Sequence, residues 1–156
     1  DKRFHFAPDW SRVGANNSDM PSLPDHLDNI DKADKERPFR LVAAPAQSYL
    51  NSTFTETPTS QKTEKQPAAK LHPDDLSTLG LKDGDQILMG NRRAEITLHA
   101  EAFDGLQLGV VVVESVWPNT AFKNELGINA LTSADPGPPN GGGVFHDTAV
   151  WIKAAS

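Results

Sequence analysis

The sequence predicts a small, mainly β fold of the barrel type. About six short apolar or β-branched stretches alternate with turns that contain glycine, a spacing typical of small all-β barrels. Only one or two stretches have the pattern of a short helix, which favours a barrel over a parallel sheet with crossover helices. The 156 residues fit one domain. A domain of that size buries roughly 68–70% of its unfolded surface and needs no disulfide or metal to hold it.

Residues 1–37 are predicted to form an irregular N-terminal arm. Isolated aromatic residues stand there among polar residues and prolines. We expect Phe4, Phe6 and Trp10 to pack on a core formed elsewhere in the chain. A disordered tail is the alternative, although three aromatic residues within the first ten are unusual for one. Residues 23–27 are expected to begin a short helix, and residues 38–156 are assigned to the barrel domain.

The first predicted strand covers residues 39–44 and leads into a long polar loop. That loop, residues 45–67, has few large apolar groups and is not expected to contribute a core element. Its first half is expected to be ordered by Tyr49, Leu50 and Phe54, and its second half to be solvated. Loops longer than about 12–15 residues in compact domains are usually functional or disordered.

The stretch from residue 70 to residue 85 predicts a short helix followed by a tight turn. Pro73 suits the first helical position, where its missing N–H is not needed. If Gly80 adopts the left-handed conformation after the helix, Leu81 meets Leu76 in the apolar contact of a Schellman ending. The turn then leads into a strand at residues 86–90.

Three further strands follow. Residues 94–100 alternate apolar and polar side chains and are expected to pair with residues 86–90 as a hairpin. The valine run 110–113 predicts a strand buried on both faces. A second long loop, residues 117–143, precedes the last strand at residues 147–153.

Composition excludes several kinds of function. The chain has no cysteine, so it cannot form a disulfide, a zinc–thiolate site or an iron–sulfur cluster. Its net charge of -6 argues against a nucleic-acid surface. No apolar run approaches the roughly 20 residues of a membrane span, so no membrane insertion is expected. The chain begins with Asp, from which we expect an excised fragment or a processed chain.

The usual catalytic patterns are missing. The five histidines have no metal-ligand spacing. Asp74 and Asp75 lie in the first turn of the predicted helix, where the helix dipole accounts for them. The glycines at 141–143 lack the residues of a phosphate-binding loop, and neither Ser48 nor Ser52 has the glycines of a nucleophile elbow. Two loops remain, residues 47–55 and 119–132, which are rich in small hydrogen-bond donors. Hydroxyl, amide and backbone N–H groups can hold phosphate without a net positive charge.

The order of motifs resembles the C-terminal molybdopterin-dinucleotide-binding domain of the dimethyl sulfoxide reductase family of molybdenum and tungsten oxidoreductases. Residues 71–75 with residues 79–85 are similar to the family's hydrophobic-x-P-x-D and L-G-I/L-x-D-G-D signature. Residues 129–132, with Asp135 and Pro136, are similar to its N-x-L-T and D-P closing motif. The resemblance covers most of the chain and is strongest over residues 38–153.

The resemblance implies a double-psi β-barrel that closes over molybdopterin guanine dinucleotide as the lid domain of a larger oxidoreductase. Carried over by position, the cofactor-binding residues would be Gln47, Asn51, Ser52, Thr53, Trp117, Asn129, Phe145 and His146. Two departures put the charged phosphate contacts in question. Glu56 stands near where relatives often have Arg, and His146 replaces the more usual Lys.

The resemblance also implies that the redox reaction needs other domains of a larger enzyme. Molybdenum or tungsten would be held together with the remaining domains of the parent enzyme, so this segment alone is not expected to be catalytic. A small standalone subunit is one variant of this interpretation. The alternative from another class is a double-psi barrel used as a protein-interaction or substrate-recognition module without cofactor. A cytoplasmic location is expected, with the periplasm as the alternative.

Overall fold

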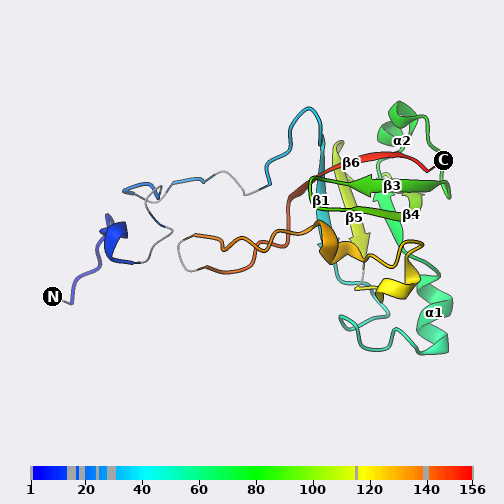
Figure 1. Cartoon of the computed structure of the whole chain (residues 1–156), viewed down its shortest axis with the longest axis horizontal. Coiled ribbons are helices and arrows are strands. Elements are labelled where there is room, and N and C mark those ends of the chain that lie inside the picture. The colour runs from blue at the N-terminus through cyan, green and yellow to red at the C-terminus, as the bar shows by residue number, and fades with distance from the viewer. Residues whose placement is uncertain are drawn as a thin grey trace.

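The computed structural model describes residues 2–13, 17, 20–23, 25–27, 31–114, 116–138 and 141–155. Within these residues, six strands close into a barrel (Figure 1). The strands are β1 (Phe39–Ala44), β2 (Ala68–Leu71), β3 (Gln86–Gly90), β4 (Glu95–Ala102), β5 (Val110–Glu114) and β6 (Thr148–Ala154). Their order around the barrel is β1, β5, β2, β4, β3, β6. The predicted mainly β barrel is therefore confirmed.

The barrel combines parallel and antiparallel neighbours. β1 runs parallel to β5, with Arg40 opposite Val110, and β2 runs parallel to β4. The other four pairs, including β1 with β6 and the β3–β4 hairpin, are antiparallel. As a result, the carboxyl ends of β1 and β5 and the amino end of β6 meet at one end of the barrel. This connectivity is compatible with a double-psi barrel, which stays a prediction at that level of detail.

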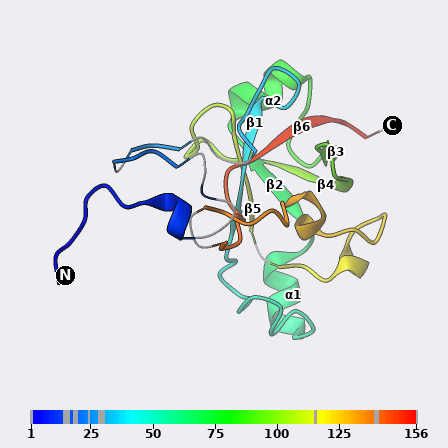
Figure 2. The same cartoon turned by 60° about the vertical axis from the view of Figure 1, so that its left-hand side comes forward.

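The barrel interior is filled by apolar side chains, most of them from alternate strand positions. Its fully buried members include Leu41, Leu71, Ile87, Met89, Ile96, Leu98, Val111, Val113 and Val150. Figures 1 and 2 both show helices α1 (Pro58–Glu64) and α2 (Pro73–Leu79) at opposite ends of the barrel. Among the described residues, none of the helices is long and apolar enough to cross a membrane.

Helix α2 has the predicted start and end. Pro73 is its first residue, and Gly80 takes the left-handed conformation with φ of 68°. The Leu81 N–H donates to the Leu76 carbonyl at 2.9 Å, and the Gly80 N–H donates to the Ser77 carbonyl at 3.1 Å. These are the two hydrogen bonds of a Schellman motif, and both leucines are buried. The helix start also has an unpredicted cap, because His72 Nδ1 accepts from the Asp74 N–H at 3.1 Å.

Other helix predictions were wrong. Residues 58–64 form α1 inside the segment predicted as a loop. Pro58 suits the first turn, and Glu64 at its end accepts from the Ser48 N–H at 2.8 Å, so the helix is tied to the preceding loop. The helix expected at residues 23–27 is not observed: residues 25–27 are irregular, and Pro24 lies outside the described residues.

Burial of the first loop and of β5 differs from the predictions in detail. Tyr49 is buried, but Leu50 and Phe54 are 65% and 55% exposed and do not order the loop from within. Val111 and Val113 point into the barrel, whereas Val110 and Val112 are only half-buried on its outer surface. A closed barrel has one interior face, so a valine run in it need not be covered on both sides.

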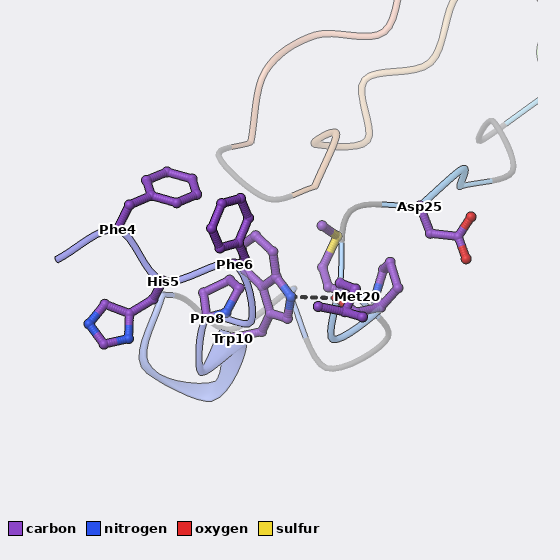
Figure 3. Close-up of a pocket in the computed structure, with 9 residues that line it drawn as sticks. Phe4, His5, Phe6, Pro8, Trp10, Met20 and Asp25 are labelled. Carbon is purple, nitrogen blue, oxygen red and sulfur yellow. Dashed lines mark hydrogen bonds between the residues drawn. The ribbon is translucent and has the colours of Figure 1, made fainter.

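The N-terminal arm extends away from the barrel (Figure 1). Its aromatic residues do not pack on the barrel core, contrary to the prediction, and Phe4 and Phe6 are 80% and 69% exposed. They instead line an apolar pocket within the arm together with Trp10 and Met20 (Figure 3). Trp10 Nε1 donates to the Pro21 carbonyl at 2.7 Å, which closes this local cluster.

Candidate functional site

A pocket of about 520 Å³ opens at the end of the barrel where β1 and β5 finish. Residues 43–46 at the end of β1 line it, together with Asn51 from the following loop. Val116, just after β5, adds an apolar surface. The volume lies within the range of about 300–1,000 Å³ that small-molecule sites occupy.

The rest of the lining comes from two segments late in the chain. The 3-10 helix η3 (Ile128–Leu131) supplies Ile128 and Asn129, and Thr132 follows directly. Phe145 and His146, immediately before β6, complete the lining. Because β6 runs antiparallel to β1, its amino end lies beside the carboxyl end of β1. Strand direction therefore brings together residues that are about a hundred positions apart in sequence.

Local backbone geometry presents the polar groups of the pocket. Asn51 has φ of 52°, the left-handed conformation that Asn adopts more readily than most residues. In η3, the Asn129 carbonyl accepts from both the Thr132 N–H at 3.2 Å and the Thr132 hydroxyl at 2.9 Å. The carbonyl is thus occupied, whereas the Asn129 side chain is exposed. Within the described part of the chain, the side-chain amides of Asn51 and Asn129 have no hydrogen-bond partner. Both can bind a ligand.

The pocket has little charge of its own. No Lys or Arg is among the described residues that line it, and the basic side chain there is His146. Next to it, Asp147 is engaged by Arg40, whose Nη2 donates to Asp147 Oδ2 at 2.7 Å. This bond, together with a second one from Arg40 Nε, raises the pKa of Arg40. Arg40 is therefore occupied by a neighbouring carboxylate.

Four of the predicted site residues meet in this pocket, namely Asn51, Asn129, Phe145 and His146. Gln47, Ser52 and Thr53 are exposed and do not line it. The backbones of Leu50 and Thr53 exchange hydrogen bonds of 3.1 and 2.9 Å, so this part of the loop closes on itself. Glu56 is also exposed and outside the pocket.

Trp117 lies in a different place from the other predicted residues. Its ring packs edge-on against Tyr49, with centroids 5.2 Å apart, and it borders a small polar recess beside the Lys70–Glu114 ion pair. Burial, together with the charge of Glu64, raises the pKa of Tyr49. Trp117 therefore helps to hold the base of the first loop.

Sequence reasoning missed the apolar part of the lining. Val116 and Ile128 have no sequence signal of their own, because their position depends on which strand ends meet. Thr132 belongs to the motif at residues 129–132, so that motif was the signal that could have identified it. Among the described residues, no group of three or more His, Asp or Glu side chains is arranged to hold a metal ion.

Comparison with known proteins decides the family. The sequence model of the family described as "Molydopterin dinucleotide binding domain" matches residues 39–149, which is most of the chain. The chain belongs to this family. The matched segment begins with β1 and ends just after the start of β6, so it includes five of the six strands in full and every wall of the pocket. The family membership predicted from sequence is confirmed.

Several relatives of this domain are oxidoreductases. The chain is 32% identical over 134 residues to the probable oxidoreductase YoaE of Bacillus subtilis, a match that covers 86% of this chain and 19% of that protein. It is 24% identical to the respiratory nitrate reductase subunit alpha of Haloferax mediterranei, a match that covers 70% of this chain and 11% of that protein. It is 26% identical to the dimethyl sulfoxide reductase DmsA of Escherichia coli, a match that covers 79% of this chain and 16% of that protein. The chain thus spans a fifth or less of the length of these relatives.

A solved structure shows the same fold. The acetylene hydratase from Pelobacter acetylenicus superposes with a TM-score of 0.75 at 18% identity, covering 94% of this chain and 22% of that protein. Residues 38–156 make up only about three quarters of this chain. The superposition therefore extends into the arm of the molybdopterin-dinucleotide-binding domain as well as its barrel.

Proposed function

We propose that this domain binds molybdopterin guanine dinucleotide and covers it as one domain of a larger molybdenum or tungsten oxidoreductase. Three findings support the proposal. The chain belongs to the family described by this cofactor, several of its relatives are named as oxidoreductases, and those relatives are at least five times longer than the matched segment. The remaining domains of the parent enzyme are the proposed partners.

The pocket between β1, η3 and the start of β6 is the observation that carries the proposal. Its free amides at Asn51 and Asn129 each offer both donors and an acceptor. A pterin or guanine edge presents the same mixture of donors and acceptors. Phe145 adds a ring that is 60% exposed, against which a heteroaromatic system can pack. These residues fit one part of an extended dinucleotide cofactor, with the rest lying outside this chain.

Phosphate groups would be bound here mainly by neutral donors. Among the described pocket residues His146 is the one basic side chain, and backbone N–H groups and amides can supply the other hydrogen bonds. The pocket is therefore suited to position an anionic cofactor without neutralising its full charge. When bound, the cofactor and its metal supply the redox chemistry, whereas this chain orients the cofactor and excludes water from it.

The proposal is tested by replacing Asn129 with Ala in the full-length parent enzyme. We expect Asn129→Ala to lower cofactor affinity about tenfold, since a buried hydrogen bond to the ligand is lost. Cofactor per protein is measured from the fluorescence of the released, oxidised pterin, and folding from circular dichroism. Gln107→Ala is the matched control because its exposed amide precedes β5, at the other end of that strand.

Two results would contradict the proposal in different ways. Unchanged cofactor content in Asn129→Ala would remove Asn129 from the site. Wild-type enzyme that purifies without any pterin dinucleotide would favour the alternative function, a barrel that serves as an interaction or recognition module. The cytoplasmic location expected from the sequence stays a prediction.

A further inference from the structure

The turn between β3 and β4 reaches across to the pocket wall. Asn91 Nδ2 donates to the Leu131 carbonyl at 2.7 Å, and Arg93 Nη1 lies 3.4 Å from the same oxygen. Leu131 is fully buried and is the last residue of η3. Asn129 and Thr132, which line the pocket, are its close neighbours in sequence. Two side chains of one turn are thus directed at the backbone that carries the pocket's polar groups.

Arg93 joins this wall to the segment that precedes β1. Its guanidinium binds Asp31 through two hydrogen bonds, Nη1 to Oδ2 at 2.8 Å and Nη2 to Oδ1 at 3.0 Å. The Asp31 side chain is only 10% exposed, and its carbonyl accepts from the Ala149 N–H of β6 at 3.0 Å. A two-pronged contact of this kind fixes direction as well as distance. The Arg93 guanidinium therefore links η3 to the incoming chain at Asp31, and the Asp31 backbone in turn binds β6.

Such support is needed because η3 is a weak element by itself. It is a 3-10 helix of four residues, and hydrogen bonds in such helices have poor geometry. No side chain caps its first residue, Gly127 being at the N-cap. The position of the Asn129 amide then depends on contacts from outside the helix, and Asn91 and Arg93 provide them from behind the pocket.

We propose that Asn91 and Arg93 are positioning residues for the cofactor pocket. They hold the Leu131 carbonyl so that Asn129 and Thr132 face the ligand, although neither residue lines the pocket itself. This inference rests on the proposed function, because the ligand is the molybdopterin dinucleotide. It adds to that function a specific requirement, namely that the β3–β4 turn sets how firmly the cofactor is retained.

Asn91→Asp separates this role from that of an ordinary turn residue. Asn91 Oδ1 accepts from the Arg93 N–H at 2.9 Å and from the Ala94 N–H at 3.4 Å, which stabilises the turn. Aspartate keeps that acceptor but removes the donor that reaches Leu131. If Asn91 serves only the turn, the variant behaves as wild type. If it positions the pocket wall, the variant loses cofactor.

Arg93→Ala has a matched control in the same turn. Arg92 is exposed and has no hydrogen bond or ion pair within the described residues, so Arg92→Ala removes the same charge without touching the contacts to Asp31 and Leu131. Arg93→Lys is the conservative variant. It retains one positive charge but not the planar guanidinium group. We expect it to release cofactor more slowly than Arg93→Ala but faster than wild type.

The experiment uses the full-length parent enzyme and two readouts. Cofactor release is followed after dilution into buffer without cofactor, and hydrogen exchange of the backbone amides of residues 128–132 is measured by mass spectrometry. We expect Asn91→Asp to speed release about fivefold, the effect of one lost hydrogen bond, and Arg93→Ala, which loses its contacts to both Leu131 and Asp31, to speed it at least as much, with Arg92→Ala unchanged. Exchange at residues 128–132 should rise in the same two variants.

The outcomes distinguish this inference from the function on which it rests. Unchanged release and unchanged exchange in Asn91→Asp would overturn the positioning role, while the cofactor bound to wild type would still support the proposed function. Cofactor missing from wild type would overturn the function and the positioning role together. If Arg93→Ala does not fold, Asn91→Asp and Arg93→Lys decide the question, since both keep the turn and most of the packing.

Discussion

Gly80 ends helix α2 by a conformation that few other residues adopt easily. Its φ of 68° is left-handed, and a Cβ placed there would meet no other atom within 4 Å. Any effect of adding a methyl group therefore comes from the backbone and not from a clash. The two Schellman hydrogen bonds and the buried contact of Leu76 with Leu81 depend on this conformation.

Gly80→Ala should lower the free energy of unfolding by about 1 kcal/mol, because an L-residue with a side chain is strained in the left-handed region. Urea unfolding followed by tryptophan fluorescence measures the change. Gly142→Ala is the matched control: a Cβ at Gly142 also meets nothing within 4 Å, but its φ is not positive. We expect the control to stay within about 0.5 kcal/mol of wild type. Equal losses in both variants would contradict the assignment of strain to Gly80.

A short polar turn, residues 34–37, leads into β1. Before β1, Asp34 Oδ1 accepts from the Glu36 N–H at 3.0 Å and from the Arg37 N–H at 2.8 Å. The Arg37 guanidinium, which is buried, also binds the Asp34 carboxylate. Mainly the hydrogen bond from this side chain, and then that from the Arg37 backbone, lowers the pKa of Asp34 below its usual 3.8. The turn is therefore held by an ionised carboxylate.

This turn should make stability depend on pH in the acid range. Because the folded state lowers the pKa of Asp34, its contribution is present above the unfolded value of 3.8 and is lost as the pH falls through the folded value. Asp34→Asn should thus reduce the free energy of unfolding more at about pH 7 than at about pH 2. Urea unfolding at both pH values measures the difference. A difference of the same size at both would contradict the role of the carboxylate.

Elements with strong local signals were predicted well, and those set by distant contacts were not. Helix α2 carries its proline start and glycine end in its own sequence, and β1 was predicted at residues 39–44 as observed. Helix α1 was missed because its residues are polar and none is buried, so they show no apolar period. The contacts of Asn91 and Arg93 join residues 38–62 positions apart, which no local pattern reveals.

The whole molecule divides into a closed barrel and an arm with its own small cluster. All members of the main buried apolar core lie between Phe39 and Ile152. In the arm, Trp10 binds the Pro21 carbonyl, and Phe4 contacts Phe6 edge-on with centroids 4.9 Å apart. Both contacts stay within the arm (Figure 3). The barrel therefore does not depend on the arm for its core.

Removing residues 1–25 should leave the barrel folded, with its unfolding temperature changed by less than about 3 °C. Scanning calorimetry of the shortened chain tests this. Removing residues 1–31 is the informative comparison, because it also deletes Asp31 and leaves Arg93 without its carboxylate, while Asp34 and its turn are kept. We expect that second chain to unfold at a clearly lower temperature. A large loss of stability already in the first chain would mean that the arm supports the barrel.

The local elements and, through the motifs, the family could be read from the amino-acid sequence without a fold. Turn residues, helix ends and apolar alternation act over a few positions, so they can be seen without a fold. Which predicted residues share a pocket became visible in the folded molecule: Asn51, Asn129, Phe145 and His146 do, whereas Gln47, Ser52, Thr53 and Trp117 do not. The fold also placed Asn91 and Arg93 behind the pocket wall. The directions of β1, β5 and β6 fix which strand ends meet, and those directions are set by pairing between strands far apart in sequence, which local patterns do not show.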